Sequence, residues 1–360
     1  MPDFHDSPIV LRNFSHRPNR FSSYLPLRSA TSRVTARLIR RLQKIFEKSA
    51  ASAANWSNAL RALALARGAE AGDLRARDLL QAYVDDRIDV AGKWLDPLHG
   101  PPQALDGYVL LILHRLAPSS RYGMALKSMA HHFVTDSARL DECLPYTPGG
   151  TLLLVDSLGM LCPFLAGYGR DFQDRDAVAL ARTQLLRFVE LNLDSDSRLP
   201  FHGYFAGGPY RLGAHGWGRG VGWFLIGLVD TLLELDAAED GVESITSAIR
   251  QCASTLRTFQ HPDGNWSWVV PLSSTSRDSS VAAFCGYALT RARRAGIVEF
   301  NDVISQAYTA LMNSAAPDGT IGESSGECRG LTEYSDCFGP QPWVQGMGAA
   351  FVIELSRETR

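Results

Sequence analysis

The strongest constraint on the fold is a succession of helical segments that runs from about residue 50 to the end of the chain. In these segments apolar residues recur at three- and four-residue spacing, which is the period of an α-helix. The alternation of apolar and polar residues that is typical of strands is nearly absent. With a basic amphipathic segment at Arg33–Phe46 included, twelve helices are predicted, and their lengths of about 11 to 20 residues are normal for globular proteins. The chain is expected to be all-α.

The predicted helices alternate in character. An apolar helix with small residues is followed by a more amphipathic one, as two concentric rings would require, because inner helices are covered on all sides and outer helices expose one face. Longer loops rich in glycine, proline and aromatic residues fall between the pairs, at Lys93–Pro102, Asp194–Gly216, Pro262–Asp278 and Pro317–Gln341. We therefore expect an (α/α)6 six-hairpin barrel in which these loops frame a pocket at one end.

Composition narrows the class of protein. The chain has 360 residues, 45% of them hydrophobic and 21% charged, which is ordinary for a globular protein with a large core. The net charge of −2 gives no reason to expect nucleic acid as a partner. No apolar run reaches the roughly 18 residues that a membrane span needs, so none is expected.

The first 50 residues differ from the rest, with ten Lys or Arg against Asp3, Asp6 and Glu47. We expect residues 1–32 to be a basic, irregular leader and residues 33–360 to form one barrel domain. No apolar region follows the first Met, so no signal peptide is expected. An acid-poor start rich in Arg and Ser also resembles an organelle transit peptide, but a solvated leader is the favoured interpretation.

The six cysteines include no CxxC pair, so a zinc site is not expected. Cys162 and Cys285 lie in apolar helical runs and are predicted to be buried thiols. Cys328 and Cys337 lie close together in a polar loop and could form a bridge. The simpler assumption is a reduced chain in the cytoplasm.

One loop points to a ligand. The sequence HGWGRGVGWFLIGLVDTLLEL, at residues 215–235, places Trp217, Arg219 and Trp223 at the start of a buried helix. Arg binds carboxylates in a two-pronged geometry, and Trp stacks on sugar rings, so the loop suits a planar anionic sugar. The alternative is that the glycines form a tight turn and the tryptophans only pack.

Two further residues are candidates for chemistry. Asp156 stands in the apolar segment TLLLVDSLGMLCPFLAG, which is predicted to be one helix. An unpaired carboxylate is costly in such a segment, and a protonated one could act as a general acid. It could instead cap a helix. His202, in LPFHGYFAGG, could bind a ligand hydroxyl or carboxylate, or only be solvated. No HExxH, GxSxG, phosphate-loop or dinucleotide motif is present in a fitting context, so neither metal nor cofactor is expected.

Four stretches, in order, resemble the family of unsaturated glucuronyl and rhamnogalacturonyl hydrolases. They are LVDSLGMLCPFLAGYG, FHGYF, WGRGVGWFLIGLVDTL and FGPQPWVQGMGAAFVIEL, and the third is the most specific. The resemblance implies a six-hairpin barrel and an oligosaccharide substrate with a 4,5-unsaturated uronic acid at its non-reducing end. It implies that an Asp protonates the vinyl ether at C4, that water adds at C5 and that no metal is needed.

By position, the resemblance makes Asp156 the catalytic acid and base, and places His202, Trp217 and Arg219 in the substrate pocket. Trp223 and Trp343, which lie in the same motifs, are further substrate-binding candidates.

The sequence departs from the family at two places. Gln103 stands where a second acid is usual, which leaves Asp106 as the candidate replacement, and Val221 replaces the usual Asn. Two hypotheses follow. The favoured one is an unsaturated uronyl hydrolase, and the other is an altered member that binds a glycan or a protein without turnover.

Overall fold

The computed structural model describes residues 37, 40–41, 56–206, 208 and 210–357. Within these ranges it contains eleven α-helices. Of the helix predicted at Arg33–Phe46, Arg37, Arg40 and Arg41 are described and helical, and the other residues lie outside the described ranges. The predicted leader at residues 1–32 also lies outside them.

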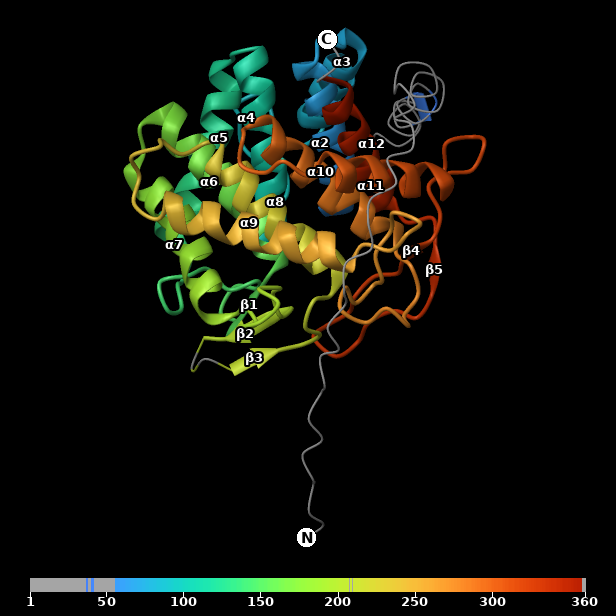
Figure 1. Cartoon of the computed structure of the whole chain (residues 1–360). Helices are drawn as coiled ribbons and strands as arrows, with labels where there is room; N and C mark the ends of the chain where they lie inside the picture. Colours follow the sequence, from blue (N-terminus) through green and yellow to red (C-terminus); the bar gives the residue numbers. More distant parts are fainter. Residues whose placement is uncertain (1–36, 38–39, 42–55, 207, 209, 358–360) are drawn as a thin grey trace.

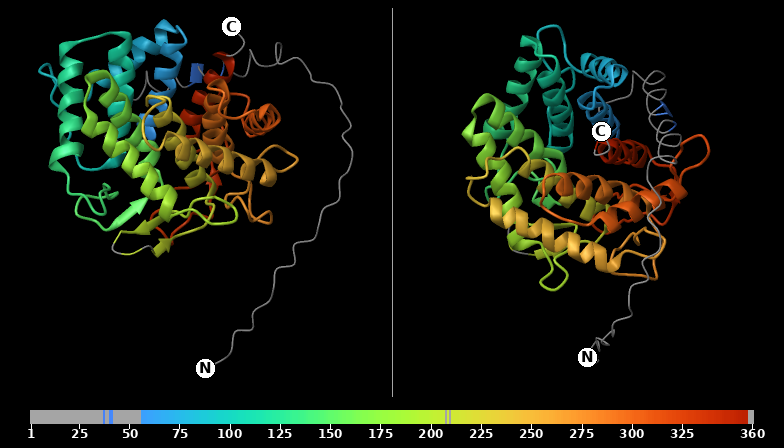
Figure 2. Two further views of the ribbon diagram at one scale, coloured as in Figure 1. Left: turned by 60° about the vertical axis from the view of Figure 1, so that its left-hand side comes forward. Right: turned by 45° about the horizontal axis from the view of Figure 1, so that its top comes forward.

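The helices form the expected six-hairpin helical barrel (Figure 1). The inner helices are α2 (Trp56–Glu70), α4 (Ala104–Leu116), α6 (Asp156–Phe172), α8 (Gly218–Leu232), α10 (Ser279–Arg294) and α12 (Pro342–Ser356). The outer helices are α3 (Leu74–Asp85), α5 (Ser120–His131), α7 (Arg175–Leu191), α9 (Val242–Phe259) and α11 (Asn301–Asn313). Each inner helix packs on the next, and α12 packs on α2 to close the ring, which the two views of Figure 2 show.

Small residues let the inner helices approach each other. Gly227 of α8 lies against α6 so closely that an added Cβ would be 2.7 Å from the backbone carbon of Leu158. Such contacts bury α8 from Gly218 to Thr231 on all sides. The outer helices are amphipathic, as predicted. In α9, for example, Ile245, Ile249 and Leu256 are buried, whereas Glu243, Arg250 and Arg257 are exposed.

Short strands lie at the end of the barrel where the inner helices begin (Figure 1). They are β1 (Leu152–Leu154), β2 (Gly203–Phe205), β3 (Tyr210–Leu212), β4 (Ser324–Ser325) and β5 (Phe338–Gly339). β1 pairs antiparallel with β2, with Leu154 opposite Gly203, and β2 pairs with β3. The segment TLLLVDSLGMLCPFLAG, predicted as one helix, is therefore a strand followed by a helix. We call this end of the molecule the loop end.

The opposite end of the barrel interior is filled by charged side chains. Arg67 of α2 contacts Asp230 of α8 at 3.0 Å, and Arg291 of α10 contacts both Asp230 at 2.6 Å and Glu354 of α12 at 3.1 Å. The hydroxyl of Tyr108 in α4 accepts a hydrogen bond of 2.8 Å from Arg67. Because five inner helices contribute to this cluster, which we call the basal ion cluster, it closes that end of the barrel.

Two short helical turns complete the described elements, a 3-10 turn at Pro101–Gln103 and a π-helical turn at His132–Asp136. Among the helices that the structure describes, none combines the length and the apolar character that a membrane crossing requires.

Candidate active site

Asp156 is the first residue of α6, at the loop end of the barrel. The amide of Val155 donates a 2.8 Å hydrogen bond to the carbonyl of His202, so the pairing of β1 with β2 sets the positions of both side chains. Oδ2 of Asp156 lies 3.3 Å from Nε2 of His202, and the Asp156 side chain is 14% exposed. Oδ2 is buried and has no aligned hydrogen-bond partner, so its contact with Nε2 is an ion pair when the imidazole is protonated.

The imidazole of His202 is held on three sides. Nδ1 lies 2.8 Å from the hydroxyl of Tyr334, the ring of Trp217 packs at a centroid distance of 4.4 Å, and Nε2 faces Asp156. Burial lowers the pKa of His202, but its contacts with Asp156 and Cys328 outweigh burial and raise the pKa to about 9. His202 is therefore an imidazolium at neutral pH.

Arg219 lies between two tryptophans at the start of α8. Its guanidinium carbon is 4.9 Å from the ring centroid of Trp217 and 4.9 Å from that of Trp343, which are cation–π contacts. Nη1 donates to the carbonyl and hydroxyl oxygens of Ser325 at 3.1 and 2.9 Å, and Nη2 donates to the carbonyl of Gly326 at 3.0 Å. Arg219 is 2% exposed, so in this structure it anchors the loop that follows β4.

A buried carboxylate holds the same loop from the other side. Asp278 caps α10 by accepting from the amide of Ser280, and it accepts from the hydroxyl of Ser325 at 2.6 Å and the amide of Ser325 at 3.1 Å. It is completely buried. Asp278 and Arg219 together fix the backbone at Ser325, and Cys328, three residues further on, reaches His202.

Several side chains from distant loops surround the Asp156–His202 pair. Burial, together with the negative charge of Asp156 and the neighbouring Glu327, raises the pKa of Tyr146 above its ordinary value. Tyr334 packs on Trp217 at 5.7 Å and on Trp268 at 5.6 Å. The prediction from sequence missed four of these side chains, namely Tyr146, Trp268, Cys328 and Tyr334. In the sequence these residues are marked only by their position in polar loops with aromatic residues. That pattern does not show which helix such a loop packs against.

The sequence candidates thus fall into two groups. The structure brings Asp156, His202, Trp217, Arg219 and Trp343 into one cluster. Trp223 lies behind this cluster in the apolar core, where it is completely buried between Trp56 and Phe284 at centroid distances of 6.0 and 5.1 Å. Trp56 also stacks on Trp343 at 5.2 Å.

Asp106 has partners of its own. It is buried in the first turn of α4, accepts a 2.6 Å hydrogen bond from the hydroxyl of Tyr83 and lies 3.5 Å from Nε of Arg87. Burial raises its pKa. Gln103 donates to the carbonyl of Pro97 at 2.6 Å and accepts from the amide of His99, so it ties down the loop before α4.

Cys328 and Cys337, for which a bridge was considered, are both free thiols. In the part of the chain that the structure describes, no three His, Cys, Asp or Glu side chains are arranged to hold a metal ion.

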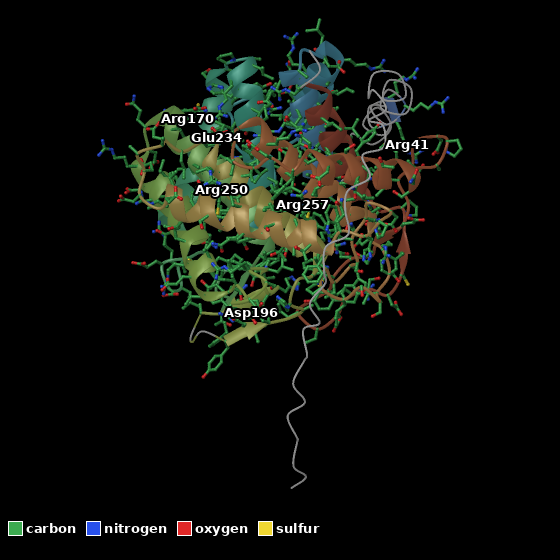
Figure 3. All side chains as sticks on the ribbon, in the orientation of Figure 1. Arg41, Arg170, Asp196, Glu234, Arg250 and Arg257 are labelled. Carbon is green, nitrogen blue, oxygen red and sulfur yellow. The ribbon has the colours of Figure 1, made fainter. Side chains whose placement is uncertain are left out.

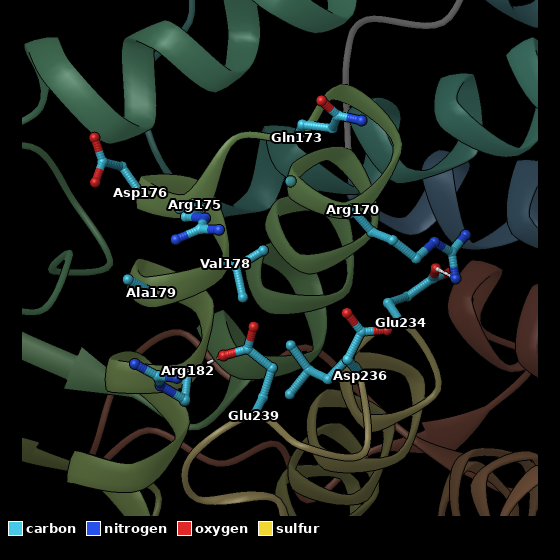
Figure 4. Close-up of a pocket in the computed structure, with 12 residues that line it drawn as sticks. Arg170, Gln173, Arg175, Asp176, Val178, Ala179, Arg182, Glu234, Asp236 and Glu239 are labelled. Carbon is cyan, nitrogen blue, oxygen red and sulfur yellow. Dashed lines mark hydrogen bonds and ion pairs between the residues drawn. The ribbon is translucent and has the colours of Figure 1, made fainter.

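A polar groove of about 790 Å³ lies far from Asp156, between the α6–α7 and α8–α9 connections (Figure 4). Two ion pairs line it, since Arg170 contacts Glu234 at 2.7 Å and Arg182 contacts Glu239 at 2.8 Å. Figure 3 places Arg170 and Glu234 at one end of the molecule and Asp196 near the strands at the other. Asp156 and Arg170 are separated by about 21 Å along α6, so the groove is no part of the cluster.

Comparison with known proteins identifies the family. Residues 30–356 match the model of Glycosyl Hydrolase Family 88. The chain belongs to this family. A comparison with curated proteins gives no match.

Solved structures of low sequence identity share the fold. A possible member of the GH105 family from Klebsiella pneumoniae superposes with a TM-score of 0.83 at 18% identity, over 96% of each chain. An unsaturated glucuronyl hydrolase from Bacillus sp. GL1 gives 0.73 at 15% identity, over 91% of this chain and 97% of that one. An unsaturated glucuronyl hydrolase specific for heparin gives 0.72 at 14% identity, over 92% and 97%. The family assignment places the protein among the glycoside hydrolases.

Proposed function

We propose that this family 88 member hydrolyses oligosaccharides that carry a 4,5-unsaturated uronic acid at the non-reducing end, with Asp156 as the acid. The observation that carries the proposal is the buried Oδ2 of Asp156, which accepts no hydrogen bond and lies 3.3 Å from a charged His202. A carboxyl oxygen with free hydrogen-bonding capacity beside a proton donor suits general acid catalysis.

The proposed reaction adds water to the double bond. The carboxyl group of Asp156 gives its proton to C4 of the vinyl ether, and the positive charge that develops at C5 is shared with the ring oxygen. Water attacks C5 and returns one proton to the Asp156 carboxylate. The hemiketal then opens and the aglycone is released, so one water molecule is consumed. This route differs from displacement at the anomeric carbon by two carboxylates.

Positive charge near Asp156 favours an anionic sugar. His202 is the cation in contact with Asp156, and Arg219 adds a second positive charge behind Trp217. We assign both to attraction of the uronate, and Arg219 also holds the loop at Ser325. Trp217 and Trp343 keep Arg219 in place and support the sugar-binding surface rather than forming much of it, since they are only 3% and 5% exposed.

The proposal rests on one acid. Asp106 bonds Tyr83 and Arg87, so we assign it the role of joining α3 to α4, and we assign Trp223 to the core. The alternative is a family member that binds a glycan or a protein without turnover, and the absence of an acid at Gln103 favours it.

The test is ultraviolet absorbance of the conjugated enol-ether carboxylate during incubation with lyase products of pectin, glycosaminoglycans and bacterial exopolysaccharides. A falling signal that Asp156→Asn abolishes supports the hydrolase and identifies the sugar class. A flat signal with every substrate, together with measurable binding of one of them, would support the alternative.

We also propose that the protein works in the cytoplasm, because all six cysteines are free thiols, as a reducing compartment would keep them. Fractionation of the source cells with antibody detection would test this, and recovery outside the cytoplasm would contradict it.

A further inference from the structure

The hydroxyl of Tyr334 has two polar partners. The amide of Ala214 donates to it at 2.7 Å, and Nδ1 of His202 lies 2.8 Å away. Tyr334 belongs to the segment between β4 and β5, which is far from both partners in sequence. The site therefore depends on three separate loops that meet at one phenol oxygen.

The direction of these hydrogen bonds follows from the protonation state of His202. When His202 is an imidazolium, both ring nitrogens carry a hydrogen, so Nδ1 donates across the 2.8 Å contact and the oxygen of Tyr334 accepts. The amide of Ala214 can also only donate. Both lone pairs of the phenol oxygen are then used, and its own hydrogen points away from the imidazole.

We propose that Tyr334 is a positioning residue that retains the Nδ1 proton of His202, so that the Nε2 proton is the one exchanged with Asp156. This inference rests on the proposed function. The 3.3 Å contact first closes to a hydrogen bond from Nε2 to Oδ2 when substrate binds. In the exchange the N–H bond at Nε2 breaks and an O–H bond forms at Oδ2, and an imidazolium and a carboxylate become a neutral imidazole and a carboxylic acid. No other reactant is needed. The acid formed is the species that protonates C4 of the substrate.

The groups that face His202 are consistent with this role. Asp156 of α6 lies at Nε2, Tyr334 lies at Nδ1, and Cys328 is the remaining titratable group in contact with the ring. Trp217 covers the imidazole without offering a proton acceptor. Among these groups Tyr334 is therefore the acceptor for Nδ1. Among the described residues, Arg219, Tyr146 and Glu327 are not in contact with the imidazole. Arg219 and Tyr146 interact electrostatically with Asp156 and Cys328, and Glu327 interacts electrostatically with Arg219 and Tyr146.

The packing around Tyr334 leaves its hydroxyl little freedom. A Cβ added at Gly213, where φ is +78°, would lie 2.8 Å from the phenol oxygen, so the chain passes close to it. Trp217 and Trp268 contact the ring of Tyr334. Removal of the hydroxyl alone should therefore leave the ring in place.

The experiment compares the full-length wild type with Tyr334→Phe, Trp268→Phe and Tyr210→Phe. The titration of His202 is followed by nuclear magnetic resonance of its ring nitrogens, and kcat and KM are measured against pH. Tyr334→Phe removes an acceptor from the charged imidazole, so the midpoint of the His202 titration should fall by about one pH unit. We expect kcat to fall about tenfold with KM changed less than twofold.

Two controls separate the hydrogen bond from packing. Trp268→Phe alters a ring that contacts Tyr334 but keeps both hydrogen bonds, so the His202 midpoint should not move. Tyr210→Phe removes the hydroxyl of an exposed tyrosine, 68% exposed on β3, and should change neither the midpoint nor the activity. An unchanged midpoint in Tyr334→Phe, or an equal fall in Trp268→Phe, would overturn the proposal.

The titration needs no substrate, so the two proposals can fail separately. If the wild type hydrolyses no unsaturated uronate, the proposed function fails while the His202 midpoint still tests the role of Tyr334. If the wild type is active and the midpoint and kcat of Tyr334→Phe match it, only the role of Tyr334 is rejected.

Discussion

Oδ2 of Asp156 lies 3.3 Å from Nε2 of His202, although the two residues come from different segments of the chain. The hydrogen bond from Val155 to the carbonyl of His202 and the pairing of β1 with β2 place them together. Because one oxygen and one nitrogen share this contact, a change at Asp156 should alter the protonation of His202.

Asp156→Asn should remove turnover and keep the fold. The amide cannot give a proton to C4, so the rate constant kcat should fall by about a hundredfold or more, as for loss of a general acid. The matched control is Asp176→Asn, which changes an exposed aspartate of α7 and should retain full activity. Equal rates for Asp156→Asn and the wild type would show that another group supplies the proton.

Activity should be lost at alkaline pH. The pKa of His202 is raised to about 9, so the charged form is present below that value and disappears as the pH rises through it. We expect kcat/KM, which reports the free enzyme, to fall above pH 9.

The free energy of unfolding should change with pH in the same direction. The contribution of His202 is complete below its unfolded pKa of about 6.5 and is lost as the pH rises to about 9. A flat stability profile between these values for the wild type would contradict the assignment.

Arg219→Ala should weaken both substrate binding and the loop. The substitution removes hydrogen bonds to Ser325 and Gly326 and a charge between two tryptophans. We expect a higher KM and a loss of about 1.5–3 kcal/mol in the free energy of unfolding. Ser325→Ala removes one of those partners but leaves the guanidinium, so its KM should rise less. An unchanged KM for Arg219→Ala on a uronate substrate would show that Arg219 is only structural.

Gly227→Ala should destabilise the barrel without changing the chemistry of the site. The added Cβ would lie 2.7 Å from the backbone carbon of Leu158, which cannot move without displacing α6. Overpacking of this kind costs about 1–3 kcal/mol, which denaturant unfolding would measure. Gly330→Ala is the matched control, because nothing lies within 4 Å of its added Cβ.

Glu354→Gln should destabilise the basal ion cluster. Burial raises the pKa of Glu354, but Arg291 and the neighbouring arginines outweigh it and hold the pKa at about 2. The stabilisation is therefore complete above the ordinary value of 4.5 and is lost as the pH falls toward about 2. Breaking a buried ion pair on one side costs about 3–5 kcal/mol. The variant should have a lower free energy of unfolding than the wild type at neutral pH. Its free energy of unfolding should also decrease less than that of the wild type as the pH falls.

The helical barrel could be predicted from sequence because inner and outer helices differ in composition. Gly227 and the leucines around it mark an inner helix, and the charged face of α9 marks an outer one. The strand at Leu152–Leu154 could not be predicted in this way, because three leucines before an apolar helix continue its pattern, and a short apolar run does not distinguish strand from helix.

The candidate site could be predicted only in part. Asp156, His202, Trp217 and Arg219 each lie at or just before the start of an inner helix or strand, where local motifs identify them. Tyr334 could not be predicted, because its contact with His202 depends on the path of the long connection between β4 and β5. That path is set by tertiary contacts at Ser325, which no local pattern encodes.

The basal ion cluster leaves the barrel interior closed at one end. Side chains of α2, α4, α8, α10 and α12 meet there, and Asp230 and Glu354 are completely buried. Because these buried ion pairs occupy the far end of the described barrel, we expect a sugar that reaches Asp156 to enter and leave from the loop end. On the proposed function, we therefore expect the protein to act on one terminal sugar unit at a time and to release each product before the next chain end enters.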